Sequence, residues 1–319
     1  MSYGPAHRTY ARDHDAWRTV QPLLPAAMRT LGDEPEEEAW TSGAATLHLD
    51  RYRVEDAPAT VVVLHGGGGH GRLLSSAGRL ARDAGIEAVM PDLPGYGLTD
   101  APPSDRRYEA WVRLAAGLVV AERERSGRPL VVAGMSLGGM LAWHVAASLP
   151  VGTVAGVVAT NLLDTADPAV RAAVVRHPAL ARVAPAALRA LPRRLDDLRV
   201  PLSLVGNVGG ISNDPAVTRA LVADRRGTGS RVALGFLRTW LAYEPPVAPE
   251  DWEHGPVLLA HPGADAWTPT ALSLRFFDRI AGPKRFLELE DGGHLPMEEP
   301  GLTTMRDAIA GLVATPAGG

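Results

Sequence analysis

A serine stands at the centre of the sequence Gly134-Met135-Ser136-Leu137-Gly138, directly after the apolar run at 129–133. The Gly-x-Ser-x-Gly pattern is typical of a nucleophile on a tight strand-to-helix turn, because small neighbours let the backbone bend sharply. The same turn would place the Leu137 amide at a helix N-terminus, where a developing oxyanion meets a donor and a positive dipole. A Gly/Ser turn without catalytic meaning is the alternative, but the apolar segments on both sides favour a nucleophile.

A serine hydroxyl is a poor nucleophile unless a base takes its proton and an acid orients that base. His294 is the candidate base, because it follows an apolar run and a Gly-Gly turn near the C-terminus. Asp265, in the turn Gly263-Ala264-Asp265, is the candidate acid. Asp164, which follows an earlier predicted strand, is the alternative acid, and Asp265 has the better local match.

The glycine-rich stretch "LHGGGGHG" (64–71) allows two interpretations. Read as Gly66-x-Gly68-x-x-Gly71 with Asp92 further on, it matches a dinucleotide-binding fingerprint. Read as His-Gly-Gly-Gly after a strand, it matches the oxyanion loop of an esterase, with the Gly67 amide as donor beside that of Leu137. The esterase interpretation is preferred, because the dinucleotide interpretation explains neither the serine turn nor the C-terminal histidine.

Alternating strand and helix patterns predict the elements that position these residues. Strands buried on both faces read as short apolar runs, whereas an alternating pattern at 46–54 indicates a half-buried strand. The apolar runs lie at 60–64, 87–90, 129–134, 152–160, 256–260 and 285–290. Helical patterns lie at 73–83, 108–125, 139–148, 271–280 and 303–313. This alternation predicts an α/β fold with a mostly parallel sheet and helices on both faces.

Two segments depart from the alternation. Residues 1–44 are predicted to be an N-terminal extension, with a helix at 17–31 and a solvated turn at the acidic run 33–40. Residues 161–250 contain amphipathic pieces without a convincing strand, and predict a helical insertion between two parts of the core, 45–160 and 251–319. Within the insertion, Trp240, Leu241 and Tyr243 either cover a pocket or, as the pattern favours, pack its own core.

With these motifs in order, the sequence from about Thr46 to Leu312 resembles an α/β-hydrolase of the esterase and lipase kind. The motifs are His65-Gly66-Gly67, Asp92-x-x-Gly95-x-Gly97, Gly134-Met135-Ser136-Leu137-Gly138, Gly263-Ala264-Asp265 and Gly293-His294-x-Pro296. The resemblance implies a twisted sheet of about eight strands with the insertion as a lid. It also implies that Asp92 is a structural turn residue.

The amino-acid composition excludes several classes of binding partner. The chain has 319 residues, a formal net charge of −4 and no cysteine, which excludes disulfides, a thiol nucleophile and Cys-ligated metals. No block of like charge suggests nucleic acid, and no apolar run suggests a secretory signal or a membrane span. We therefore expect a cytoplasmic protein with a small-molecule acyl substrate; a homodimer is compatible with the sequence, which leaves the oligomeric state open. No cofactor is expected, and His70 and His261 lack partners at metal-ligand spacing.

The sequence thus predicts a serine hydrolase that cleaves esters of small or medium apolar acyl groups. A thioesterase, a C–C bond hydrolase, an amide hydrolase or an acyl transferase would use the same three residues, because bond choice depends on pocket side chains. Epoxide hydrolases and haloalkane dehalogenases of this fold use an aspartate where this chain has Ser136. A non-catalytic protein that binds a small hydrophobic molecule is the alternative from another class.

Overall fold

The structure is a computed structural model that describes residues 1–177 and 181–314, and the side chains as far as residue 308. A nine-stranded sheet forms its centre, in the order β1-β2-β3-β5-β4-β6-β7-β10-β11. The strands are β1 Ser2–Pro5, β2 Glu36–Ser42, β3 Ala45–Tyr52, β4 Thr60–Leu64, β5 Glu87–Pro91, β6 Leu130–Gly134, β7 Gly156–Ala159, β10 Val257–Pro262 and β11 Lys284–Leu289. Neighbouring strands from β5 to β11 in this order are parallel. The pairs β1 with β2, β2 with β3, and β3 with β5 are antiparallel.

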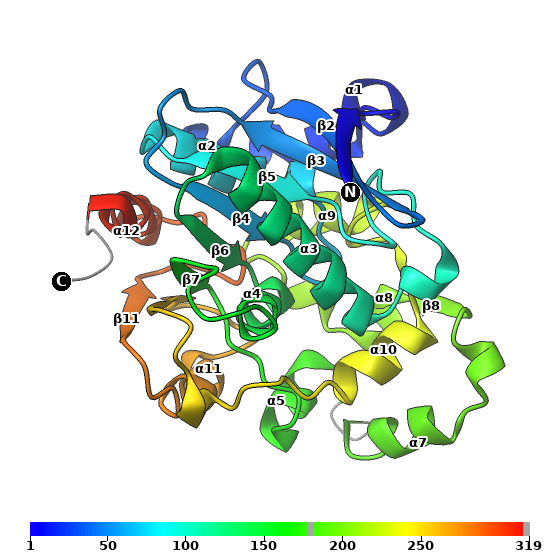
Figure 1. Cartoon of the computed structure of the whole chain (residues 1–319). Helices are drawn as coiled ribbons and strands as arrows, with labels where there is room; N and C mark the ends of the chain where they lie inside the picture. The colour runs from blue at the N-terminus through cyan, green and yellow to red at the C-terminus, as the bar shows by residue number, and fades with distance from the viewer. Residues whose placement is uncertain (178–180, 315–319) are drawn as a thin grey trace.

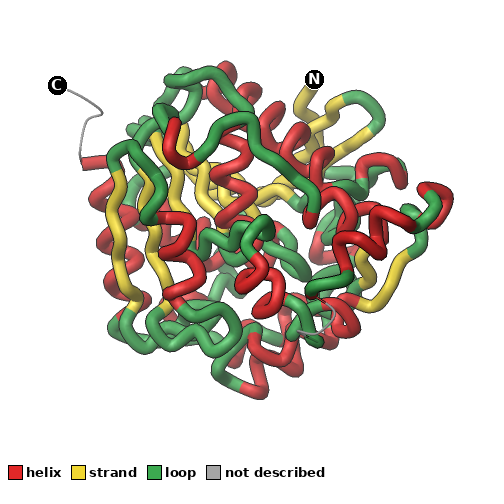
Figure 2. The backbone as a smooth tube through the Cα atoms, turned by 90° about the horizontal axis from the view of Figure 1, so that it is seen from below, coloured by secondary structure: helices red, strands yellow, loops and turns green. Residues whose placement is uncertain are grey.

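Helices cover both faces of the sheet (Figures 1 and 2). Along β4, Val62 and Leu64 join one hydrophobic cluster while Val61 and Val63 join another on the opposite face. This alternation follows from the two-residue period of a strand, and explains why the whole run is apolar. The helices that pack on the sheet are α2 Ser75–Asp83, α3 Tyr108–Ser126, α4 Leu137–Ala147, α11 Thr270–Phe277 and α12 Gly301–Ala314.

The insertion at 161–250 lies between β7 and β10 and gathers to one side of the sheet (Figure 1). Its described helices are α5 Pro168–Val174, α7 Ala184–Ala190, α8 Leu202–Val205, α9 Pro215–Ala223 and α10 Leu234–Leu241. It also contains a two-stranded ribbon, β8 Arg199–Pro201 with β9 Arg231–Ala233, which the sequence did not predict. Strands of three residues are too short to display a period.

The N-terminal segment differs from the prediction in two ways. The acidic run is not a solvated turn, because β2 begins at Glu36 and the Glu38 carboxylate pairs with the buried Arg51. The predicted helix at 17–31 is replaced by the short 3₁₀ turns Ala16–Thr19, Gln21–Leu23 and Ala26–Met28, after the single-turn α1 Tyr10–Asp13. Pro22 and Pro25 lack the amide hydrogen that a continuous helix requires.

Strands β1 and β2 of this segment extend the sheet to nine strands, where about eight were expected. None of the helices in the described part of the chain combines the length and the apolar character that crossing a membrane demands.

Candidate active site

Ser136 occupies a strained turn between β6 and α4, with φ of 57° and ψ of −127°. Residues other than glycine rarely adopt such a positive φ, so the surrounding structure must hold Ser136 in this conformation. A Cβ atom at Gly134 would overlap the Gly138 carbonyl, and a Cβ at Gly138 would overlap the Leu64 carbonyl of the adjacent strand. The two glycines are therefore required for the turn to fit against β4.

The three residues proposed from sequence as nucleophile, base and acid meet at the carboxyl ends of the parallel strands. The Ser136 Oγ lies 2.8 Å from Nε2 of His294, and Nδ1 of His294 lies 2.8 Å from Oδ2 of Asp265. His294 and Asp265 are buried, whereas Ser136 is half-buried. The hydroxyl thus sits at the accessible end of a buried hydrogen-bonded chain.

The protonation of Asp265 fixes the direction of these bonds. Burial raises the pKa of Asp265, but hydrogen bonds from His294 and Thr268 and the attraction of His294 outweigh it and lower the pKa to about 2. An ionised carboxylate only accepts, so Nδ1 of His294 donates to it. Nε2 is then left as the acceptor for the Ser136 hydroxyl, which is the arrangement a general base requires.

Asn161 is a functional candidate that the sequence did not single out. Its Nδ2 donates to Oδ2 of Asp265 at 3.2 Å and lies 3.1 Å from Nε2 of His261. Its Oδ1 accepts from Thr160 Oγ1, which in turn accepts from the Ser136 amide at 3.0 Å. Asn161 and Thr160 thus link Asp265 to the strained turn at Ser136. In the sequence, only the position of Asn161 directly after a predicted strand could have indicated this role.

A further histidine near the site, His261, is buried beside Asn161. Its Nδ1 lies 2.9 Å from the Pro262 carbonyl oxygen, and Nε2 faces the Asn161 amide nitrogen. Burial lowers the pKa of His261, so the neutral ring donates through Nδ1 and accepts through Nε2. His261 therefore holds the Asn161 side chain in its orientation toward Asp265.

Asp164, the alternative acid, lies elsewhere. Its Oδ1 accepts from the Ala166 amide at 2.8 Å, and its Oδ2 faces Arg279 at 3.9 Å. The structure brings Asp265, and not Asp164, to His294.

The glycine-rich loop packs against the serine turn. A Cβ at Gly66 would lie 2.9 Å from the Met135 carbonyl oxygen and 3.2 Å from the Leu137 amide nitrogen, so only a glycine allows this approach. His65 holds the loop in place, because its Nε2 accepts from the Leu93 amide and its Nδ1 donates to the Gly66 carbonyl. Burial lowers the pKa of His65 to about 4, which keeps the ring neutral for both bonds.

Asp92 is buried among backbone donors and not in a ligand pocket. Its carboxylate accepts from the amides of Gly71 and Leu98, each at 2.6 Å, and from the Tyr10 hydroxyl. A Cβ at Gly97 would overlap this carboxylate. Asp92 thus holds the turn after β5 against the loop after β4, as the structural interpretation expected.

His70 has an acidic partner that sequence spacing concealed. Its Nε2 lies 2.8 Å from Oδ2 of Asp224, 154 positions away, and Oδ1 of Asp224 lies 2.8 Å from Nε2 of His14. The Arg226 and Gly227 amides also donate to Oδ1. Both carboxylate oxygens therefore already accept hydrogen bonds, and the cluster fastens the N-terminal segment to the insertion.

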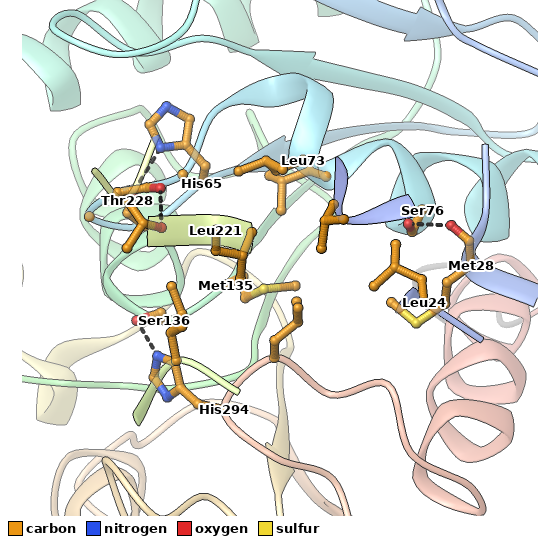
Figure 3. Close-up of a pocket in the computed structure, with 18 of the residues that line it drawn as sticks. Leu24, Met28, His65, Leu73, Ser76, Met135, Ser136, Leu221, Thr228 and His294 are labelled. Atoms are coloured by element: carbon orange, nitrogen blue, oxygen red, sulfur yellow. Dashed lines mark hydrogen bonds between the residues drawn. The ribbon is translucent and has the colours of Figure 1, made fainter. Parts of the chain in front are cut away.

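Two pockets open on Ser136 and His294, with empty volumes of about 760 and 670 Å³ that include open solvent at their mouths. Both are also lined by Gly67 and Trp267. The first, shown in Figure 3, extends along the glycine-rich loop toward Leu24 and Met28. The second lies under the insertion and is lined mainly by apolar residues of it, including Phe236 and Trp240.

Comparison with known proteins agrees with this geometry. The model of the alpha/beta hydrolase family matches residues 61–305. The solved monoacylglycerol lipase of Paleococcus ferrophilus is similar, with a TM-score of 0.66 and 22% identity over 84% of this chain and 98% of that chain. A soluble variant of the Saccharomyces cerevisiae monoglyceride lipase gives a TM-score of 0.70 at 16% identity, over 88% and 95%.

Epoxide hydrolase A of Mycobacterium thermoresistibile is also similar, with a TM-score of 0.55 and 18% identity over 88% of this chain and 98% of that chain. Among curated proteins, no sequence matches this chain significantly. At these identities the solved structures establish the fold, while the family model spans well over half of the sequence. The chain therefore belongs to the alpha/beta hydrolase family.

Proposed function

We propose that this hydrolase cleaves carboxylic esters with apolar groups through Ser136, His294 and Asp265. One observation carries the proposal: the Ser136 hydroxyl lies 2.8 Å from a histidine that an ionised aspartate orients, and it faces two pockets with largely apolar linings. Two of the similar structures are monoacylglycerol and monoglyceride lipases, which act on esters, and this supports the choice of bond.

In the proposed reaction, His294 Nε2 takes the hydroxyl proton while Ser136 Oγ bonds to the ester carbonyl carbon. The carbonyl oxygen becomes an oxyanion beside the Gly67 and Leu137 amides, and the Asp265 carboxylate stabilises the imidazolium. His294 then gives its proton to the departing alkoxide, which leaves an acyl-Ser136. Water repeats the sequence on this intermediate and releases the acid, with no cofactor in any step.

The insertion at 161–250 is proposed to act as a lid over the second pocket. Its residues Leu202, Val205, Phe236, Leu237 and Trp240 form much of that lining. An apolar roof excludes water from the reacting carbonyl, and so strengthens the electrostatic contribution of the two amides. The same lining determines which substrate binds, and therefore which bond Ser136, His294 and Asp265 cleave.

A fluorophosphonate tests the central step, because it reacts with an activated serine and leaves a covalent adduct that intact-mass spectrometry detects. We expect one adduct on the parent protein, none on Ser136→Ala, and greatly slowed labelling of His294→Ala. Circular dichroism would verify that all three proteins are folded. Absence of the adduct on the folded parent, together with binding of an apolar ligand without turnover, would favour a non-catalytic binding protein instead.

A further inference from the structure

The first pocket ends on a wall built from the N-terminal segment. Val20, Leu24 and Met28 line it, and each is at most 5% exposed. In Figure 3, Leu24 and Met28 lie at the end of the pocket opposite Ser136 and His294. All three residues precede position 61, where the match to the family model begins. This wall is therefore a feature of this chain and not of the matched family region.

We infer that the wall formed by Val20, Leu24 and Met28 sets the length of an unbranched apolar chain bound beside Ser136. The inference rests on the proposed ester hydrolysis and adds the substrate class: an ester with an apolar group on each side of the scissile carbonyl. Both pockets reach Ser136, His294 and Gly67, so the two groups of one ester enter different pockets while its carbonyl remains at the serine.

The lining of the first pocket favours an apolar occupant, because most of its polar side-chain groups are bonded to the protein. Ser76 Oγ donates to the Met28 carbonyl at 2.6 Å, and Thr228 Oγ1 donates to the Gly68 carbonyl at 3.0 Å. The Gln21 amide oxygen accepts from the Thr30 amide at 2.7 Å, and both ring nitrogens of His65 are bonded to backbone. A polar chain would lose hydrogen bonds to water there and would gain few partners in exchange.

The remaining lining supplies apolar contact along the path from the serine to the wall. Met135 lies close to Ser136, and Leu73 and Leu221 lie between the two ends of the pocket in Figure 3. These side chains come from three separate elements: the serine turn, the 3₁₀ turn before α2, and α9 of the insertion. Each methylene buried against them removes apolar surface from water, so longer chains bind better until they meet the wall.

The wall is anchored to the core. The Ser76–Met28 hydrogen bond ties it to α2, as does the contact of Thr30 Oγ1 with Ser75 Oγ at 3.0 Å. The Arg72 guanidinium lies 4.9 Å from the Trp17 ring centroid, and Asp50 holds that guanidinium with two hydrogen bonds. A wall with so many fixed contacts limits the chain length sharply, because its displacement would break several of them.

Substitutions at Leu24 test the inference, with the neighbouring Leu23 as matched control because that side chain is 37% exposed. Two ester series are needed: nitrophenyl esters with acyl groups from acetyl to dodecanoyl, and acetate esters with alkyl groups from methyl to dodecyl. For Leu24→Trp we expect the ratio of kcat/KM for the longest chain to that for the shortest to fall about tenfold or more in one series. Leu24→Ala shifts the preferred length upward in the same series, and Leu23→Trp changes neither ratio.

The series that responds identifies the group in this pocket, acyl or alkyl. Unchanged length profiles for both Leu24 variants, with acetate ester still hydrolysed, would overturn the inference and leave the proposed function intact. Failure of the parent to hydrolyse any ester or to react with the fluorophosphonate would instead refute the proposed function. Thermal unfolding and the labelling stoichiometry identify a variant that does not fold, and Met28→Trp and Met28→Ala then provide the same test.

Discussion

The molecule contains two chains of hydroxyl, imidazole and carboxylate with nearly the same distances. In the first, His294 joins Ser136 to Asp265 with contacts of 2.8 Å on both sides. In the second, His70 joins the Tyr10 hydroxyl, 2.9 Å from Nδ1, to Asp224, 2.8 Å from Nε2. Hydrogen-bond geometry alone therefore does not distinguish the proposed catalytic chain from the other.

The surroundings of the two hydroxyl groups do distinguish them. Ser136 is half-buried at the meeting point of two pockets, and its oxygen faces the space where a carbonyl would bind. Tyr10 and His70 are fully buried, and the Tyr10 hydroxyl donates to Asp92. Burial and the Asp92 charge raise the pKa of Tyr10 well above its usual value, so this hydroxyl keeps its proton.

The comparison shows what the proposed nucleophile has in addition to a neighbouring base. An accessible oxygen and a proton whose acceptor is the base occur together at Ser136 and not at Tyr10, and the proposed oxyanion donors lie on the Ser136 side. The second chain instead joins three parts of the molecule: the N-terminal segment, the glycine-rich loop and the insertion. The same chemical groups serve attachment where no substrate can enter.

The largest expected difference is between the two hydroxyls. Ser136→Ala should lower kcat for acetate ester hydrolysis by about 10⁵- to 10⁶-fold, because covalent catalysis is lost. Tyr10→Phe should leave that kcat within about threefold, while it lowers the free energy of unfolding by about 1 to 3 kcal/mol through the loss of a buried donor. Steady-state kinetics and urea unfolding of both variants measure these effects. A large loss of kcat in a folded Tyr10→Phe protein would contradict the assignment.

Substitution of the two carboxylates, Asp265 and Asp224, should also have different effects, with a smaller loss of kcat than for Ser136→Ala. Asp265→Asn is expected to reduce kcat about 10⁴-fold, because an amide no longer stabilises the imidazolium or fixes the ring tautomer. Asp224→Asn should cost about 3 kcal/mol of unfolding free energy, because His14 and His70 lose a buried charged partner. Its acetate ester hydrolysis should stay within tenfold, and comparable rate losses in both variants would remove the distinction.

The smallest expected effect concerns a property that the two chains share, the loss of folding stability at low pH. Hydrogen bonds from histidines overcome burial and lower the pKa of both Asp265, to about 2, and Asp224. Each carboxylate therefore stabilises the fold fully above its unfolded pKa of about 3.9, and this stability disappears as pH falls through the folded pKa. Asp265→Asn should flatten the dependence of unfolding free energy between about pH 4 and pH 2 by about 2 kcal/mol. Urea unfolding at several pH values measures the slope, and an unchanged slope would refute the lowered pKa.

The central part of the fold could be predicted from sequence because local patterns determine it. Strand β4 is apolar at every position since both of its faces are covered, and α4 follows a serine turn whose glycines leave a recognisable spacing. The meeting of Ser136, Asp265 and His294 was predictable for a related reason. Each follows a parallel strand, and the carboxyl ends of such strands share one edge of the sheet.

Other features depend on partners that are distant in sequence. The acidic run before Trp40 resembles a solvated turn until Arg51, buried in the adjacent strand, supplies a counter-charge for Glu38. His70 lacked an apparent partner because Asp224 comes from the insertion. Asn161 carries no motif, and its contact with Asp265 arises only when β7 and β10 pair.

The bond between His14 and Asp224 joins residues separated by 210 positions, and this separation bears on how the molecule folds. Closing so long a loop costs conformational entropy that can be recovered only after the intervening sheet has formed. The N-terminal segment and the insertion should consequently dock late in folding, on a core whose serine turn already exists. The far wall of the first pocket, which the N-terminal segment supplies, should therefore reach its place only after the serine turn at the other end of that pocket has formed.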